Sequence, residues 1–270
     1  MSAINTNLAS LNAQRNLMTS QSSLDTSIQR LSSGLRVNSA KDDAAGLSIA
    51  TKMDAQIRGM SQAARNANDG ISMAQTADGG LATAIDALQR MRELAVQGAT
   101  GTVGGADATN LDKEYQALAS EVTRVATDTK FNGKAILSTA GSAATDIQVG
   151  ADVGQKITIP ATDLESQSVT GDVATQATAN VAIAAIDTAM ATINTMRADL
   201  GASQNRLGYA ASNLQSSVEN QSAAKSRIMD TDFASETAKL TRGQILQQAG
   251  TAMLAQANSA PNGVMALLRG

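Results

Sequence analysis

A row of aliphatic residues spaced seven apart runs through residues 181–229 and constrains the fold more than any other feature. Six of its seven positions are aliphatic, and the row reads Ile186, Ile193, Leu200, Leu207, Leu214, Gln221 and Ile228. A weaker row starting at Ile183 runs beside it. Two such rows form the seam of a helix that packs lengthwise on another helix. At about 1.5 Å per residue this helix is roughly 75 Å long, so it needs a partner of comparable length.

The partner is predicted in residues 46–95, where apolar residues recur every three or four positions. Glycines fall inside this pattern at Gly59, Gly70, Gly79 and Gly80. Each weakens a helix by about 1 kcal/mol relative to Ala, so we interpret them as places where a neighbouring segment approaches closely. A break at 79–80 remains an alternative. Asp42 and Asp43 stand where carboxylates cap a helix, and without histidine a catalytic or metal role for them is a poor alternative.

Both ends of the chain carry weaker apolar stripes, separated from the long helices by breaks near 34–42 and 230–232. The predicted polymerisation stripes are Leu17, Leu24, Ile28, Leu31, Leu35, Leu246, Met253, Leu254 and Leu268. Helices with so little to bury cannot readily offset about 1–2 kcal/mol of backbone entropy per residue. We therefore expect the terminal helices to be loose in the monomer and to order when a partner covers their stripes. Pro261 should kink the second of them.

The middle of the chain holds the loops. A turn-rich loop at 98–108 precedes a third helix, and strand-like pieces follow at 135–137, 146–149 and 156–159. Residues 161–180 are polar and unpatterned and predict an exposed loop. The fold class is therefore mainly α, with long antiparallel coiled-coil-like helices, a small β-hairpin region, and paired N- and C-terminal helices.

Composition excludes several classes of function. The 270 residues include no Cys, His or Trp, which leaves neither thiolate chemistry nor the commonest general base and metal ligand. We expect no enzyme, no catalytic or metal residue and no cofactor. The ends are only weakly basic around an acidic centre, so no nucleic-acid surface is expected. No apolar run reaches the roughly 20 residues of a membrane span, and the N-terminus lacks the apolar core of a cleavable signal peptide.

Motifs along the whole chain resemble one family, the bacterial flagellins, which are the subunits of the flagellar filament. The resemblance covers nearly everything except about 98–110 and 138–180. Its motifs agree in order from both ends, and they are INTN at 4–7, LSSGLRVN at 31–38, DDAAGL at 42–47, RNANDGIS at 65–72, LQRMRELAVQ at 88–97, FNG at 131–133, IQVG at 147–150, NRL at 205–207, SRIMD at 226–230, QILQQAG at 244–250 and VMALLR at 264–269. The unpatterned segment at 161–180 is short, so the chain resembles a short form without outer variable domains.

The resemblance implies a two-part organisation and a set of partners. Residues 1–42 plus 231–270 would form inner filament-core helices, and 43–230 an outer rod domain with long helices at about 44–97, 110–129 and 181–229 and a hairpin region at about 131–160. The implied partners are further copies of itself in a helical homopolymer, flagellar cap and junction proteins, and an export chaperone covering the C-terminal stripe. The implied location is the extracellular flagellum, reached without a cleavable signal peptide.

The resemblance also implies a host-recognition surface. Positions matching those that Toll-like receptor 5 of animal hosts binds in relatives are Gln89, Arg90, Leu94, Gln97 and Glu114. The alternative is that Arg90 and Glu114 simply pair between neighbouring helices or subunits, and both roles can hold together.

The leading interpretation is thus a structural subunit that polymerises into the flagellar filament used for swimming, through folding of its terminal helices on assembly. Two alternatives remain open at this stage. A hook–filament junction protein shares the end motifs, and a secreted coiled-coil effector or adhesin would form a soluble oligomer of fixed size instead of filaments.

Overall fold

The computed structural model describes residues 6–139 and 143–268, with side chains described as far as residue 259. The chain divides into two compact units. Residues 1–55 and 220–270 form one, called here the terminal unit, and residues 56–219 form the other, called the rod unit. The architecture is mainly α with two small antiparallel hairpins, which confirms the predicted fold class.

Long helices account for most of the chain. They are α1 (Leu8–Ser33), α2 (Ala44–Gly98), α3 (Gly105–Asp128), α4 (Gln176–Met229) and α5 (Phe233–Leu268). Helix α2 begins where predicted and runs unbroken through Gly79 and Gly80, so the alternative of a break there was wrong. Helices α3 and α4 each begin five residues earlier than predicted.

Local chemistry places the two breaks where the sequence indicates them. Gly34 ends α1 in the left-handed conformation with φ 71°, which glycine adopts without strain. The Asp43 carboxylate accepts a hydrogen bond from the Gly46 amide at 2.8 Å and so caps the start of α2. In the C-terminal break, Asp232 Oδ1 accepts one from the Ala234 amide at 2.9 Å at the start of α5. The two breaks also meet, because Leu35 and Asp230 form an antiparallel β-bridge.

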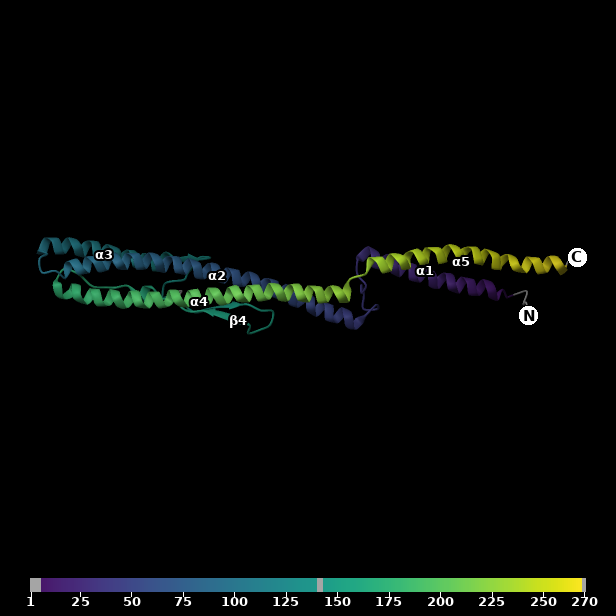
Figure 1. The fold of residues 1–270 in the computed structure, drawn as a ribbon, viewed down its shortest axis with the longest axis horizontal. Helices are drawn as coiled ribbons and strands as arrows, with labels where there is room; N and C mark the ends of the chain where they lie inside the picture. Colours follow the sequence, from purple (N-terminus) through teal and green to yellow (C-terminus); the bar gives the residue numbers. More distant parts are fainter. Residues whose placement is uncertain (1–5, 140–142, 269–270) are drawn as a thin grey trace. The chain divides into compact units, whose positions relative to one another are not determined.

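The core of the rod unit lies between α2, α3 and α4, which lie alongside one another in Figure 1. Ile186, Ile193, Leu200, Leu207 and Leu214 of the predicted seam are all buried. Ile228, which falls in the terminal unit, is only partly buried. Two ion pairs join α2 to α4 in antiparallel register, Arg92 with Asp187 and Asp78 with Arg197, each at 2.7 Å. A slip of one heptad would separate both pairs, so they help to fix the register of an alanine-rich interface.

Glycines in α2 allow the close approaches that the sequence predicts. A Cβ at Gly70 would lie 3.1 Å from Leu207 Cδ1 and 3.1 Å from Ile147 Cγ1. At Gly80 it would lie 2.6 Å from Leu137 Cδ1, so even alanine would force that side chain to move. Gly79 faces open space and has no such role.

Two hairpins cover part of this core. Strand β3 (Thr145–Gln148) pairs with β4 (Lys156–Ile159), as the alternating residues predict. Strand β1 (Lys130–Phe131) pairs with β2 (Lys134–Ala135), and β1 was not predicted. Asn132 and Gly133, with φ 50° and 80°, form a two-residue turn whose twist suits a hairpin.

Residues 161–175 do not form the exposed loop that was predicted. Leu164, Val169 and Val173 are buried in the core of the rod unit, and a 3₁₀ turn, η1 (Glu165–Gln167), lies between the first two. Two hydrogen bonds attach the segment to the rest of the rod unit. The Leu164 amide donates to Leu137 O at 2.9 Å, and the Val173 amide donates to the Asp112 carboxylate at 3.0 Å. The prediction failed because single apolar residues at irregular spacing leave no periodic signal.

Candidate assembly surfaces

The terminal unit is built on an antiparallel pair of helices, α1 and α5, which lie side by side in Figure 1. Leucines of α1 pack over glycines of α5 at heptad spacing. A Cβ at Gly243 would lie 3.1 Å from Leu24 Cδ1, and one at Gly250 would lie 3.0 Å from Leu17 Cδ1. The absent glycine side chains therefore let the two helices approach closely and place Leu17 and Leu24 between them.

Polar contacts tie the same two helices together along their length. They are Asn7 Nδ2 to Ala257 O, Ser10 Oγ to Asn258 Oδ1, Gln247 Nε2 to Gln21 Oε1, and Ser27 Oγ to Glu236 Oε1, each at 2.7 Å. Such bonds specify register and orientation but add only about 1 kcal/mol each to stability. The pairing of the terminal helices is thus specific without being strong.

Glu236 is the one acidic side chain buried in this pair among the described residues, at 4% exposure. Burial raises the pKa of a carboxyl group, but hydrogen bonds donated by Ser27 and Lys239 outweigh it here. The pKa of Glu236 is therefore held below its usual range, and the side chain is charged at neutral pH.

Little apolar surface is buried inside the terminal unit. Among its described side chains the only buried hydrophobic residues are Leu24, Val37 and Ala50, and none belongs to the core of the rod unit. Burying a large aliphatic side chain contributes about 1.5–3 kcal/mol, so this set supplies only a small part of what two long helices need to stay ordered.

Large apolar side chains instead point outward from both helices. Leu11, Met18 and Ile28 are exposed on α1 and are called here the α1 outer stripe. Ile245, Leu246 and Met253 are exposed on α5 and are called the α5 outer stripe. Leu246 is 52% exposed even though its helix is paired. Contiguous exposed apolar patches are typical of sites that contact another molecule, so the two outer stripes are candidate contact surfaces.

The predicted stripe residues divide between the inside and the outside of the pair. Ile28, Leu246 and Met253 are exposed, whereas Leu24 is buried; those partly buried are Leu17, Leu31, Leu35 and Leu254. The side chain of Leu268 lies outside the described residues. Leu11, Met18 and Ile245 were not among the predicted stripe residues, although the sequence spaces Leu11 and Met18 seven apart and sets Ile245 beside Leu246.

A groove of about 530 Å³ runs along one side of the α1–α5 pair. Its α5 wall is Leu246, Ala249, Gly250 and Met253, and its α1 wall is Ala9, Asn12, Ala13, Asn16, Leu17 and Ser20. Four of these lining residues, Ala9, Ala13, Ala249 and Gly250, are small, and the larger apolar side chains are Leu17, Leu246 and Met253.

The predicted host-recognition residues do not all lie at the surface. Gln89, Arg90, Gln97 and Glu114 are exposed, but Leu94 is 1% exposed and packs in the core of the rod unit. Arg90 pairs with Glu114 of α3 at 2.9 Å and with Glu93 at 2.8 Å. These hydrogen bonds, to Glu93 and then Glu114, raise the pKa of the Arg90 guanidinium. The helix-to-helix pairing considered from the sequence is therefore present.

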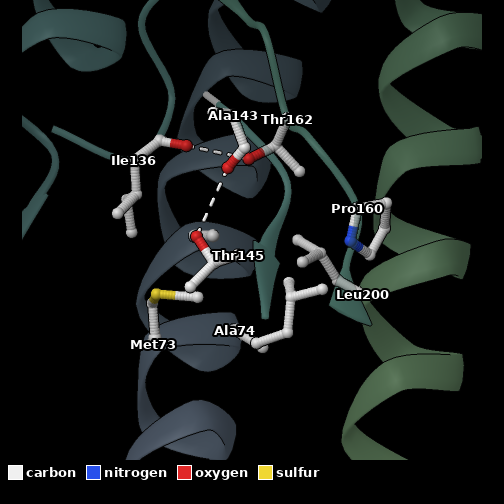
Figure 2. Close-up of a pocket in the computed structure, with 10 residues that line it drawn as sticks. Met73, Ala74, Ile136, Ala143, Thr145, Pro160, Thr162 and Leu200 are labelled. Atoms are coloured by element: carbon white, nitrogen blue, oxygen red, sulfur yellow. Dashed lines mark hydrogen bonds between the residues drawn. The ribbon is translucent and has the colours of Figure 1, made fainter. Parts of the chain in front are cut away.

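A small cavity lies between α2, α4 and the hairpin region, as Figure 2 shows. Its volume of about 20 Å³ suits at most a single water molecule. The hydroxyl groups at its edge already have partners: Thr162 Oγ1 donates to Ile136 O at 2.8 Å, and Thr145 Oγ1 to Ala143 O at 3.3 Å. This cavity is a packing feature.

Within the described part of the chain, no cluster of three or more acidic, histidine or cysteine side chains is placed to hold a metal ion. None of the helices in that part is long and apolar enough to span a membrane. The described surface features that stand out are thus the outer stripes, the groove, and the ion pairs of Arg90 with Glu93 and Glu114 on α2 and α3.

Comparison with known proteins identifies relatives at both ends of the chain. A family model described as the bacterial flagellin N-terminal helical region matches residues 4–142, and one described as the C-terminal helical region matches residues 183–268. Flagellin of Halalkalibacterium halodurans is 44% identical over 271 residues, covering 98% of this chain and 99% of the relative. Flagellin A of Vibrio cholerae is 34% identical over 376 residues, with the same coverage. That alignment is longer than this chain, so the Vibrio relative carries segments that this chain lacks.

Solved structures give the same result. The crystal structure of Bacillus cereus flagellin superimposes with a TM-score of 0.52 at 36% sequence identity. The match covers 60% of this chain and 94% of that one.

Proposed function

Because the chain belongs to the bacterial flagellin family and is a structural subunit of the extracellular flagellar filament, we propose that its α1 and α5 outer stripes are the surfaces through which copies join. The filament subunit is favoured over the junction protein and the adhesin considered from the sequence. Flagellins are structural proteins, in keeping with the expectation that this chain is not an enzyme.

The exposure of the outer stripes carries this proposal. The Leu–Gly contacts of the α1–α5 pair leave Leu246, Met253 and Met18 uncovered. Among the described residues of the terminal unit, no other segment covers these side chains. Identical copies bring identical stripes, and a contact that repeats without closing builds a helical polymer.

Ordering of the terminal helices accompanies this assembly. The only buried hydrophobic residues among the described side chains of the terminal unit are Leu24, Val37 and Ala50, whereas each outer stripe offers large exposed apolar side chains. Neighbouring copies thus provide the burial that offsets the backbone entropy of α1 and α5. The helices are specific in their pairing and depend on neighbours for their stability.

A matched pair of substitutions tests the proposal. Leu246→Gln places a polar group on the α5 outer stripe, and Val181→Gln makes the same kind of change at an exposed apolar residue of α4. Leu246→Gln should raise the critical concentration for polymerisation about tenfold or more, because the variant loses apolar burial and buries the glutamine amide on assembly. Val181→Gln should change it less than about twofold. Equal effects from the two variants would refute the role of the stripe.

Before assembly the α5 outer stripe needs another cover. We propose that an export chaperone binds Leu246 and Met253 in the cell, and that cap and junction proteins meet the filament ends. The same exposed side chains support the first of these. Leu246→Gln should weaken chaperone binding in a pull-down of the purified monomer, and unchanged binding would exclude this site.

We further propose that the exposed host-recognition residues predicted from the sequence, Gln89, Arg90, Gln97 and Glu114, form a surface for Toll-like receptor 5. Leu94 supports them from the core without contacting the receptor. A reporter-cell assay of soluble monomer provides the test, with Arg90→Ala expected to reduce the response. Arg124→Ala is the control, because Arg124 also forms exposed ion pairs, with Glu121 and Asp128 of α3. No response to the unmodified monomer would remove the proposal.

A further inference from the structure

We propose that Met18 and Met253 are oxidation-sensitive positions, at which conversion to methionine sulfoxide prevents a copy of this chain from joining a filament. The inference rests on the proposed function, because it requires the outer stripes to be covered in the filament. It adds a modification site, an oxidant class and a consequence for assembly.

Composition directs peroxide chemistry to methionine in this chain. There is no Cys, Trp or His, so the residue types that would compete most strongly for an oxidant are absent. Methionine thioethers are oxidised by peroxides to the sulfoxide, and enzymes can reduce the sulfoxide again. The 11 methionines are therefore the side chains at which oxidation begins.

Exposure then selects among the methionines. Met18 is 73% exposed and Met253 is 65% exposed. The others whose side chains are described are partly or fully buried, with Met91 at 0%. Both exposed methionine residues lie on the terminal unit, one on each outer stripe, although the chain places methionines in both units.

The chemical step needs no group from the protein beyond the thioether. The sulfur lone pair attacks one oxygen of hydrogen peroxide, the O–O bond breaks as the S–O bond forms, and proton transfer releases water. Sulfur loses two electrons and the peroxide gains them. The product is a strongly polar sulfoxide on a side chain that was apolar.

The position of Met253 makes this change costly for assembly. Met253 and Leu246 form the apolar part of the groove wall on α5. In a filament the surface that covers them is an outer stripe of another copy, whose Leu, Ile and Met side chains have no hydrogen-bond donor. A sulfoxide oxygen that faces this stripe would lack a partner there, because the polar side chains of the groove, Asn12, Asn16 and Ser20, lie on its α1 wall. Burying it should lower affinity by about tenfold or more per site.

Three proteins test the proposal: the unmodified chain, the double variant Met18→Leu/Met253→Leu, and Met91→Leu as a buried-methionine control. Monomers of each are treated with hydrogen peroxide, sulfoxide is located by peptide mass spectrometry, and the critical concentration is measured by sedimentation. Each treated sample is compared with its own untreated sample, so any effect of the substitution on assembly cancels. Leucine keeps nearly the volume of methionine and cannot be oxidised in this way.

The expected result is sulfoxide first at Met18 and Met253, with the critical concentration raised at least about tenfold for the unmodified chain and for Met91→Leu. The double variant should change less than about twofold, and methionine sulfoxide reductase should restore assembly of the oxidised unmodified chain. Loss of assembly in the double variant, or normal assembly of monomers oxidised at both positions, would overturn the proposal.

Oxidation of preformed filaments separates this proposal from the one it rests on. Covered stripes should protect Met18 and Met253 in the filament. Oxidation there as fast as in the monomer would refute the proposed covering of the stripes, and this inference with it. Protection in the filament together with undisturbed assembly of oxidised monomers would refute the oxidation proposal alone.

Discussion

Leu207 and Gly70 face each other across the α2–α4 interface and allow a quantitative test of its packing. Leu207 is fully buried, and its Cδ1 lies 3.1 Å from the point that a Cβ at Gly70 would occupy. Truncating a buried leucine to alanine removes its burial and leaves a cavity, so Leu207→Ala should destabilise the rod unit by about 2–4 kcal/mol. Gln215→Ala, at an exposed position of α4, should change stability by less than about 0.5 kcal/mol.

Combining Leu207→Ala with Gly70→Ala predicts the sign of the coupling free energy between the two positions. Gly70→Ala gains about 1 kcal/mol of helix propensity but must displace Leu207 Cδ1 and Ile147 Cγ1, both 3.1 Å away. In the Leu207→Ala background the first of these obstacles is gone, and the new methyl group partly fills the cavity. Gly70→Ala should therefore be more favourable in that background, with a coupling of about 1 kcal/mol.

Urea denaturation of the monomer, followed by circular dichroism, measures the free energy of unfolding of the unmodified chain, the three single variants and the double variant. A loss below about 1 kcal/mol for Leu207→Ala would mean that the side chain is not packed as described. Strict additivity of the two substitutions would mean that Gly70 and Leu207 do not share this space.

Further predictions concern the cap of α2, the segment 161–175 and Glu236. Asp43→Ala should lower the free energy of unfolding by about 0.5–2 kcal/mol and speed amide exchange in the first turn of α2, whereas Asp43→Asn should keep the cap. Equal exchange rates in the two variants would contradict the assignment of Asp43 as the cap of α2. Val173→Ala should lower the free energy of unfolding, measured by thermal unfolding, by about 2 kcal/mol, and Val153→Ala, at a fully exposed position, by less than about 0.5 kcal/mol. Equal losses in the two variants would mean that segment 161–175 is not packed on the core. Because the folded-state pKa of Glu236 is lowered, its stabilisation is present above the ordinary carboxyl pKa and is lost as pH falls through the lowered pKa. Filaments should dissociate in that pH range. Glu236→Gln should weaken the filaments at pH 7 and reduce the pH dependence of their stability more than Asp25→Asn does. Identical pH profiles for the two variants would exclude Glu236 as the titrating group.

Periodic features could be predicted from the sequence. The seven-residue row from Ile186 to Leu214 is buried as expected, because a helix that packs lengthwise must repeat its contacts at that interval. The breaks at Gly34 and Asp232 follow from local turn and cap chemistry in the same way. These features depend on neighbours in sequence or on a regular period, both of which a single sequence displays.

Features that depend on irregular tertiary contacts could not be predicted. Val173 and Leu164 lie in a polar segment, and only the hydrophobic surface of the rod unit gives them a place to pack. Strand β1 has two residues, too few for an alternating pattern, although Asn132-Gly133 is itself a hairpin signal. Leu94 was assigned to a surface because its position matches a motif, and the motif does not say which face of α2 is covered.

Hydrogen exchange of the terminal helices tests most directly whether neighbouring copies supply their stability. Amides of residues 11–31 and 240–254 would be followed by mass spectrometry in the dilute monomer and in the assembled filament. The small core of the terminal unit predicts rapid exchange in the monomer and exchange slowed by about a thousandfold or more in the filament. Strong protection of these amides already in the monomer would contradict it.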